Sequence, residues 1–357
     1  MGDNPSRSAD ANAGGSGVTG RHTRAAGTGV SPRPPDGLTP LGGGGALPKK
    51  ARFSMESGFR GLSVSAGAMV LVIILAIAIF LISKAVPALS ANNASFLTST
   101  AWFPNDTEPR FGIAALAFGT VLTSVIALVV AVPIALGIAL FLSHYASRRL
   151  AIPLGFSIDL LAAVPSVVFG LWGRDVFLIP VRDFSVWLNH YFSWIPLFGG
   201  DGPFGRSIML GSLVLAIMVL PIITSLSREV FLQTPGMNEE AALALGATKW
   251  EMVRTAVLPY GKPGVIAAVM LGLGRALGET IALAMTLGIV FNISFNLIQN
   301  GGNSIAANIA NTFGEANATG RGALIASGLL LFTITLVVNM AARAIIYRRR
   351  EFRDSAA

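Results

Sequence analysis

The sequence predicts an all-α integral membrane protein with six transmembrane helices and both termini in the cytoplasm. Of its 357 residues, 53% are hydrophobic and only 12% are charged, whereas a soluble domain normally carries about 25% charged residues. The apolar residues fall in blocks of about 20 residues or more, the length that crosses a bilayer core of about 30 Å. Each block is too long for a strand, so each is predicted to be a helix that satisfies its own backbone polar groups in lipid.

Six apolar blocks follow a polar start, and they set the predicted domain boundaries. The blocks are Val64–Val86, Ile113–Leu142, Ala151–Leu171, Ile208–Leu226, Gly264–Val290 and Ala323–Ile346. Residues 1–60 are rich in Gly, Ser, Pro and Arg and are predicted to be a disordered cytoplasmic tail, because they cannot bury enough apolar surface to offset chain entropy. The six-helix domain is predicted to cover residues 61–346, and a basic cytoplasmic tail residues 347–357.

The distribution of basic residues predicts the orientation. With a cytoplasmic N-terminus, 19 of the 26 Lys and Arg residues lie in cytoplasmic segments and six in outer segments, with Arg275 left inside the fifth helix. Basic residues gather on the cytoplasmic side of membrane proteins. The same rule accounts for the formal net charge of +8, so no nucleic-acid partner is predicted. The absence of cysteine excludes disulfides and thiolate metal sites, and the sequence predicts no metal or cofactor.

Two outer segments have their own character. Residues 174–206 are aromatic, with apolar side chains at helical spacing, and predict a short helix in the membrane interface. A surface that also receives a partner is the alternative interpretation of that segment. Residues 292–320 are rich in Asn, Gly and Ala and predict a loop that contains a short helix.

The cytoplasmic loop between the fourth and fifth helices, residues 228–262, is predicted to contain two short helices. Asn238 can cap the first helix, which places Glu239 and Glu240 at its positive end. Gly246 suits the left-handed residue that ends a helix.

The second helix of this loop has its own start and stop signals. Thr248 and Glu251 have the spacing of a capping box. Pro259 is predicted to close the helix, because the residue before a proline avoids the helical conformation.

Two charged residues lie deep in the fifth apolar block. Arg275 and Glu279 are four residues apart, which places them on one face of a continuous helix, close enough to pair. Charges near the middle of a membrane cost roughly 2.5 to 3.5 kcal/mol each on insertion scales and point to function. The hypothesis is that Arg275 offers its planar fork to an oxyanion and that Glu279 holds Arg275 when the site is empty. The alternative is an ion pair that only locks helix packing.

Pro165 and Ser166 in the third block are further candidates for a transport path. A proline inside a helix breaks the hydrogen-bond ladder and can leave nearby N–H groups free. In transporters, the N-termini of half-helices often face anions near the midplane, where the Ser166 hydroxyl could add a donor. A simple kink is the alternative.

The cytoplasmic loop resembles the coupling motif of importer-type ABC permeases. The matching residues are Glu240, Ala241, Ala242, Gly246, Leu258 and Pro259, with Glu239 directly before them. Ala256 departs from the pattern, since the family usually has a larger aliphatic residue there. In the family this loop docks into a cleft on an ATPase subunit. The chain contains no phosphate-binding loop of the type Gly-x-x-x-x-Gly-Lys-Ser/Thr, so ATP hydrolysis is expected on a partner.

Three further runs resemble the phosphate-specific permeases, the PstC and PstA pair. They are Asp159–Gly170, Leu220–Glu229 and Arg275–Glu279, with Ala163 standing where the family usually has glycine. The segment Trp102–Thr120 favours the PstC type. The resemblance covers roughly residues 60–350.

The resemblance implies the importer-type ABC permease fold and a channel subunit in the bacterial cytoplasmic membrane, not an enzyme. Inorganic phosphate would pass from a PstS-like binding protein through this subunit and a PstA-like permease, embedded in lipid, by alternating access driven by a PstB-like ATPase dimer. A permease for another oxyanion, such as sulfate or molybdate, stays open, as do a passive anion channel and an intramembrane enzyme. For an enzyme, His22, His144 and His190 are widely separated and no metalloprotease or serine-hydrolase motif is present.

Overall fold

The structure, a computed structural model, describes the backbone of residues 55–354 and the side chains of residues 58–344. Most of the predicted N-terminal tail, residues 1–54, therefore lies outside the described residues, as do residues 355–357. Residues 55–62 form the first turns of the first helix, and the compact unit that holds the remaining elements begins at Ser63.

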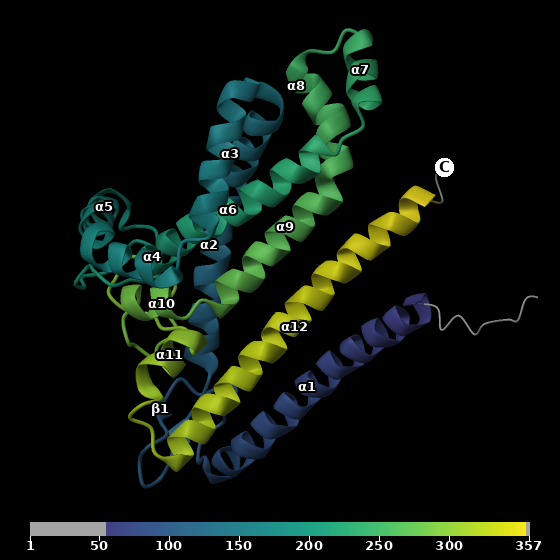
Figure 1. The fold of residues 1–357 in the computed structure, drawn as a ribbon. Helices are drawn as coiled ribbons and strands as arrows, with labels where there is room; N and C mark the ends of the chain where they lie inside the picture. Colours follow the sequence, from purple (N-terminus) through teal and green to yellow (C-terminus); the bar gives the residue numbers. More distant parts are fainter. Residues whose placement is uncertain (1–54, 355–357) are drawn as a thin grey trace, which may run out of the picture. The chain divides into compact units, whose positions relative to one another are not determined.

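Most of the described chain is helical, and its only named strands form one small hairpin (Figure 1). Its elements are α1 (Met55–Ala91), β1 (Trp102–Phe103), β2 (Arg110–Phe111), α2 (Ala114–Leu140), α3 (Arg148–Ala162), α4 (Ser166–Trp172), α5 (Leu178–Phe192), α6 (Ile208–Leu232), α7 (Gly236–Ala244), α8 (Lys249–Met252), α9 (Leu258–Gly278), α10 (Ile281–Thr286), α11 (Ile305–Thr312) and α12 (Ala318–Asp354). Three π-helical turns extend the helices, at Phe141–Tyr145, Gly173–Phe177 and Val253–Val257.

Five helical runs within residues 55–354 are long and apolar enough to cross a membrane. They are Gly58–Ala91, Ala114–Tyr145, Ile208–Leu232, Lys249–Gly278 and Ala318–Ala344. A sixth crossing is available if the bent pair Arg148–Ala162 and Ser166–Phe192 counts as one span. The predicted all-α membrane fold is confirmed.

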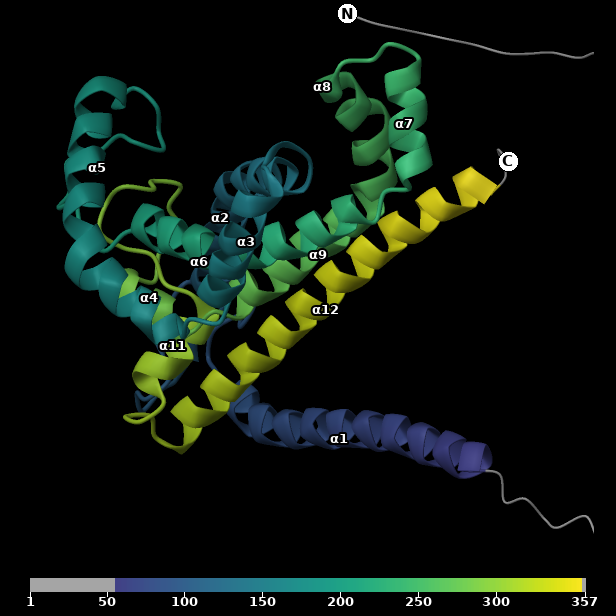
Figure 2. The same cartoon turned by 45° about the horizontal axis from the view of Figure 1, so that its top comes forward.

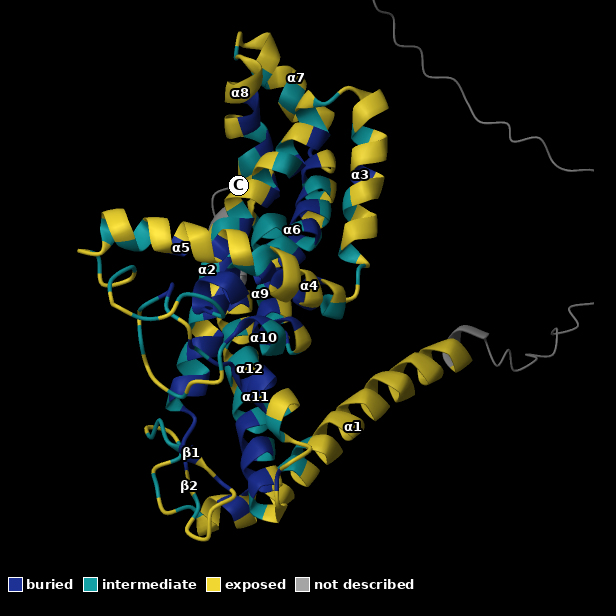
Figure 3. Ribbon diagram, turned by 90° about the vertical axis from the view of Figure 1, so that its left-hand side faces the viewer, coloured by how far each residue is buried: buried dark blue, intermediate teal, exposed yellow. Residues whose placement is uncertain are grey.

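Helix α6 is the centre of the unit and packs most extensively against α2 and α9. Along the facing side of α2, Ala127, Ala131 and Ala135 are fully buried at a spacing of four. Small residues in such a row let two helices approach closely, which is how helices associate where no hydrophobic effect drives them together. Figure 3 shows buried residues, in dark blue, along α2 and α6, whereas α1 is exposed along most of its length.

Helix α1 is apolar on every side and exposed along most of its length, as expected of a helix surrounded by lipid. Only its outer end packs against the rest of the unit. There Ala88 joins a buried cluster with Trp102 of the hairpin and Leu324 of α12.

The third predicted span, Ala151–Leu171, is not one helix. It ends at Ala162 and restarts at Ser166, with a bend of 90° between the two segments. Pro165 stands in extended conformation at the break, with φ −60° and ψ 138°. The helix breaks here for two reasons. Pro165 has no backbone N–H to donate to the helical ladder, and its ring disfavours the helical conformation of the residue before it.

The fifth predicted span, Gly264–Val290, is also interrupted. Helix α9 ends at Gly278, and Glu279 has an extended ψ of 126° before the short helix α10 begins. Three glycines in the last two turns of α9 lower its helix propensity by roughly 1 kcal/mol each. The prediction of a helix continuous to Val290 was wrong.

The helices expected in the two outer segments are present. Helix α5 carries Phe184, Trp187 and Tyr191 on an exposed aromatic side, with stacked or tilted rings about 5 to 6 Å apart. Helix α11 lies in the Asn- and Gly-rich segment, and its start is fixed by Thr120 of α2, whose Oγ1 accepts the Ile305 N–H at 3.0 Å.

The junction of α2 with the start of α11 gives a first stability prediction. A Cβ at Gly119 would clash with the backbone carbonyl of Asn303, and backbone cannot swing aside as a flexible side chain can. Gly119→Ala is therefore expected to destabilise the protein by about 1–3 kcal/mol or more, as overpacking does. The measurement is the thermal midpoint of the purified protein in detergent. Gly137→Ala in the same helix is the control, because nothing lies within 4 Å of a Cβ there. Equal midpoints for the two variants would contradict the prediction.

Candidate functional site

Helices α7 and α8 form the two short helices predicted for the loop between α6 and α9 (Figures 1 and 2). The first begins earlier than predicted. Its N-cap is Pro235, no side chain caps it, and Asn238 lies inside its first turn. The prediction that Asn238 caps α7 was wrong, because Pro235 already sets the extended residue from which the helix starts.

The turn between α7 and α8 has the predicted chemistry. Gly246 has φ +85°, in the left-handed region. The capping box of α8 is complete: Glu251 Oε2 accepts the Thr248 N–H at 2.8 Å, and Thr248 Oγ1 accepts the Glu251 N–H at 3.3 Å. These two bonds satisfy backbone donors that a helix start otherwise leaves open.

Pro259 does not close the second helix. It lies in the first turn of α9, and the run from Lys249 to Gly278 is helical throughout. The π-helical turn Val253–Val257 directly precedes it, and such a wider turn accommodates a residue that cannot donate a ladder hydrogen bond. The loop is thus joined to the membrane helix without a hinge.

Large apolar side chains are exposed around the turn between α7 and α8. We call this group the coupling surface; it consists of Met237, Leu243, Leu245 and Trp250. Leu245 is 90% exposed and Met237 is 80% exposed. Apolar residues clustered at one exposed tip of a protein mark a contact with another protein.

The two glutamates at the start of the coupling motif have different surroundings. Glu239 turns inward, and its Oε1 lies 3.4 Å from Nε2 of His144, a residue at the end of the α2 run. Glu240 is exposed. Sequence reasoning placed both at the helix start but missed His144 as the partner of Glu239, because 95 residues separate them.

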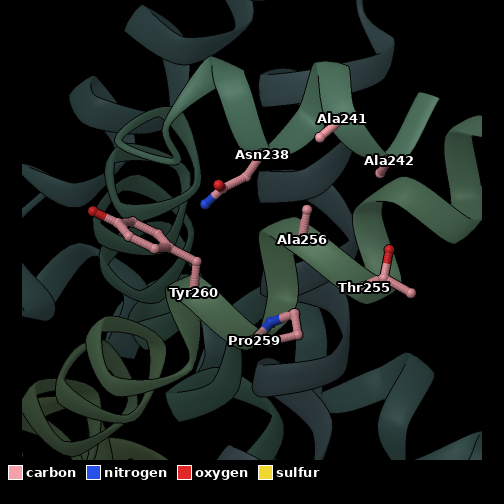
Figure 4. Close-up of a pocket in the computed structure, with 7 residues that line it drawn as sticks. All are labelled: Asn238, Ala241, Ala242, Thr255, Ala256, Pro259 and Tyr260. Atoms are coloured by element: carbon pink, nitrogen blue, oxygen red, sulfur yellow. The ribbon is translucent and has the colours of Figure 1, made fainter. Parts of the chain in front are cut away.

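A cavity of about 450 Å³ lies between α7 and the run that leads into α9 (Figure 4). It is lined by Asn238, Ala241, Ala242, Thr255, Ala256, Pro259 and Tyr260. Three of these residues are alanines, and one of them is the position where a larger aliphatic residue was expected. The small side chains leave space beside the coupling motif.

Arg275 and Glu279 do not pair, contrary to the prediction. No ion pair of Arg275 is formed within residues 58–344; its side chain is exposed, while Glu279 is buried. The spacing of four brings two residues together only on a continuous helix, and α9 ends between them. Glu279 instead caps α10, with Oε1 accepting the Ala282 N–H at 3.2 Å.

The six-residue helix α10 is held at both ends by charged side chains. Glu279 holds its start, and at its other end Arg206 Nη2 donates to the Ala284 carbonyl at 2.7 Å. Burial of the Arg206 guanidinium, together with the nearby charge of Arg174, lowers the pKa of Arg206 from its usual value. The short helix after the break therefore has a fixed position.

The two interrupted spans meet in the fold. Helix α4, which begins after Pro165, packs along α10, which begins after Thr280. The contact is close because Gly170 faces the backbone of Ala282 and the sulfur of Met285. Two of the predicted path residues, Pro165 and Ser166, thus start one of the packed half-helices, and Glu279 caps the other.

Arg275 opens into a different space, a cavity of about 870 Å³ between α9 and α12. Asn339 and Arg343 of α12 line the same cavity. Sequence reasoning missed both of them, since Arg343 was counted only among the cytoplasmic basic residues. The sequence did contain a sign that these two residues share a site, since Arg343 follows Asn339 by four residues inside the last apolar block.

The cap at α10 gives a second prediction. Glu279→Ala removes the acceptor and is expected to lower stability by about 1 kcal/mol, as loss of a helix cap does. Glu279→Gln keeps an oxygen that accepts the Ala282 N–H and is expected to stay near wild type. Thermal midpoints of the purified protein separate the two. If Glu279 served mainly as a counter-charge, the two variants would lose the same stability.

The chain matches known membrane transport proteins. Residues 131–351 match the family described as "Binding-protein-dependent transport system inner membrane component". The phosphate transport system permease protein PstC 2 of Mycobacterium tuberculosis is 49% identical over 80% of this chain and 90% of that protein. The PstC protein of Xylella fastidiosa strain Temecula1 is 41% identical over 81% of this chain and 90% of that protein. Among solved structures, the inward-facing MetNI methionine ABC transporter aligns with a TM-score of 0.45 at 18% identity, covering 64% of this chain and 90% of that chain.

Proposed function

This chain belongs to the binding-protein-dependent transport permeases, in the group of PstC phosphate permeases, and we propose from this premise that it carries inorganic phosphate inward through the bacterial cytoplasmic membrane. It is a permease subunit of an ABC importer, so an ATPase on another chain supplies the energy. The observation that carries the proposal is 49% identity to a PstC protein over 292 residues, which is 80% of this chain and 90% of that protein.

The substrate contact that we propose is Arg275. Its guanidinium lies in the last turn of α9, carries no counter-charge within residues 58–344 and opens into a cavity. A planar guanidinium binds an oxyanion through two parallel hydrogen bonds. Pro165, Ser166 and Glu279 belong to the proposed path as the residues that start and cap the packed half-helices.

The coupling step that we propose uses the coupling surface and the motif residues beside it. These are Glu239, Glu240, Ala241, Ala242, Gly246, Leu258 and Pro259. The helical run Lys249–Gly278 connects this region to Arg275 without a break, over about 40 Å at 1.5 Å per residue. A displacement of the docked loop is therefore transmitted along one stiff helix to Arg275. This mechanical connection supports transport by alternating access.

The partners of this proposal are a PstB-like ATPase dimer, a PstA-like second permease and a PstS-like phosphate-binding protein. A second permease is needed because the face of α9 that carries Arg275 is exposed in a single subunit, and a charge facing lipid is unfavourable.

Reconstitution tests the proposed function. The complete complex in proteoliposomes, with binding protein outside, is expected to accumulate labelled inorganic phosphate only when ATP is present on the ATPase side. Excess unlabelled sulfate or molybdate should leave that uptake unchanged. Uptake of sulfate or molybdate in place of phosphate would transfer the function to another oxyanion, and uptake without ATP would make the protein a passive channel.

A further inference from the structure

The cavity between α9 and α12 is lined by one stripe of each helix, with Ile222 of α6 beside them. On α9 the stripe runs from Ala267 to Arg275, and on α12 from Leu336 to Arg343, in both cases with lining residues three or four apart. Figures 1 and 2 show the two helices side by side and running in opposite directions. Arg275 therefore lies at the level of Leu336, and Arg343 at the level of Ala267, about 12 Å away along the helix axis.

The charges in this cavity are all of one sign. Arg275 and Arg343 both line it, Asn339 lies one turn before Arg343, and none of the described lining residues is acidic. Neither arginine forms an ion pair within residues 58–344. Both side chains are exposed in this single chain, and cations within a membrane domain are unfavourable without a counter-charge.

We propose that Arg343 and Asn339, together with Arg275, form a binding site for a phosphate group in this cavity. Of the two arginines, Arg343 lies nearer the cytoplasm, since the membrane span of α12 ends at Ala344. Its guanidinium donates two hydrogen bonds to two phosphate oxygens, and the Asn339 amide donates a further hydrogen bond to the same group. A cavity of about 870 Å³ also has room for water around the anion.

The phosphate group has two possible sources. If the group is free inorganic phosphate, the site adds a second anion contact to the proposed transport path, on the cytoplasmic side of Arg275. This version rests on the proposed function. As the headgroup of an anionic lipid it would make the same residues a lipid site that opens between α9 and α12.

The test compares Arg343→Gln with wild type in the complete complex. One readout is ATP-driven uptake of labelled phosphate into phosphatidylcholine vesicles, and the other is the shift in thermal midpoint that inorganic phosphate or added phosphatidylglycerol causes in the purified complex. Arg149→Gln is the matched control: it removes an exposed arginine at the start of α3 that lies outside the cavity.

If free phosphate is the occupant, Arg343→Gln loses the phosphate-induced shift and takes up phosphate about 10-fold more slowly or worse, since a charge-assisted contact is removed. If a lipid headgroup is the occupant, the shift caused by phosphatidylglycerol is lost and inorganic phosphate causes none even in wild type. Arg149→Gln keeps the wild-type shifts in both cases. An Arg343→Gln complex with wild-type uptake and wild-type shifts overturns the site.

Arg343→Lys covers the case in which Arg343→Gln does not assemble. It keeps the charge but loses the planar fork, so uptake or the lipid shift is expected to fall several-fold; wild-type values would again overturn the site. Wild-type vesicles separate this proposal from the proposed function. If they take up no phosphate with ATP, the proposed function fails, while the lipid shift still tests the site.

Discussion

Replacing Arg275 with Gln is expected to lower ATP-driven phosphate uptake by about 30-fold or more, while ATP hydrolysis by the complex continues. Losing one side of a desolvated, charge-assisted contact costs about 2–5 kcal/mol, and each 1.4 kcal/mol is a factor of ten. Arg275→Lys keeps the charge but not the two-pronged geometry, so an intermediate fall is expected. Labelled-phosphate uptake into proteoliposomes, with ATP hydrolysis measured in the same samples, gives both quantities.

The matched control is Arg182→Gln. Arg182 is exposed on α5 and pairs with its neighbour Asp183 at 3.0 Å, away from the cavity of Arg275. It is expected to transport at the wild-type rate. Wild-type uptake by Arg275→Gln would remove Arg275 from the path, and a loss of ATP hydrolysis together with uptake would assign it to assembly instead.

The structure also changes what a double substitution is expected to do. If Arg275 and Glu279 were an ion pair that only locked packing, Arg275→Gln combined with Glu279→Gln would restore uptake. Because Glu279 caps α10 and forms no ion pair with Arg275, the double variant is expected to fold and hydrolyse ATP but to move no phosphate.

Gly246→Val is expected to uncouple the permease from its ATPase. A residue with a Cβ costs about 1–2 kcal/mol in the left-handed region, and a β-branched side chain is worse. Nothing lies within 4 Å of a Cβ at Gly246, so the effect is one of backbone conformation and not of collision. The turn that presents Leu245 and Trp250 of the coupling surface should distort, with less ATPase recovered in pull-downs and slower uptake.

Two further substitutions isolate the backbone effect. Gly246→Asn is expected to retain most of the ATPase, because asparagine tolerates the left-handed conformation. Gly236, at the start of α7, does not have a positive φ, and nothing lies within 4 Å of a Cβ there. The Gly236→Val variant should therefore also bind the ATPase normally. Equal ATPase recovery with Gly246→Val and Gly246→Asn would show that the turn conformation does not matter for docking.

Local chemistry determined much of this protein from its sequence alone. The apolar blocks are long enough only for membrane helices, and five long helices and one bent pair occupy them. The left-handed Gly246 and the capping box of Thr248 and Glu251 formed as predicted, because each depends on residues within one turn. The family motif in the same loop was visible for the same reason, since its residues are close together in the chain.

The tertiary structure decided where helices stop and which charges meet. The length of the fifth apolar block predicted a continuous helix, and the spacing of four predicted an Arg275–Glu279 pair on it. Instead, α10 is a separate helix, held by the Glu279 cap, the Arg206 hydrogen bond and its packing against α4. Those contacts join residues up to about 115 positions apart, such as Gly170 and Met285, so no local pattern signals them. Arg343 likewise shares a cavity with Arg275 only because α12 packs beside α9. The position of a helix break and the occupant of a cavity are set by the sum of such distant contacts, whereas caps and turns are set by the energies of neighbouring residues.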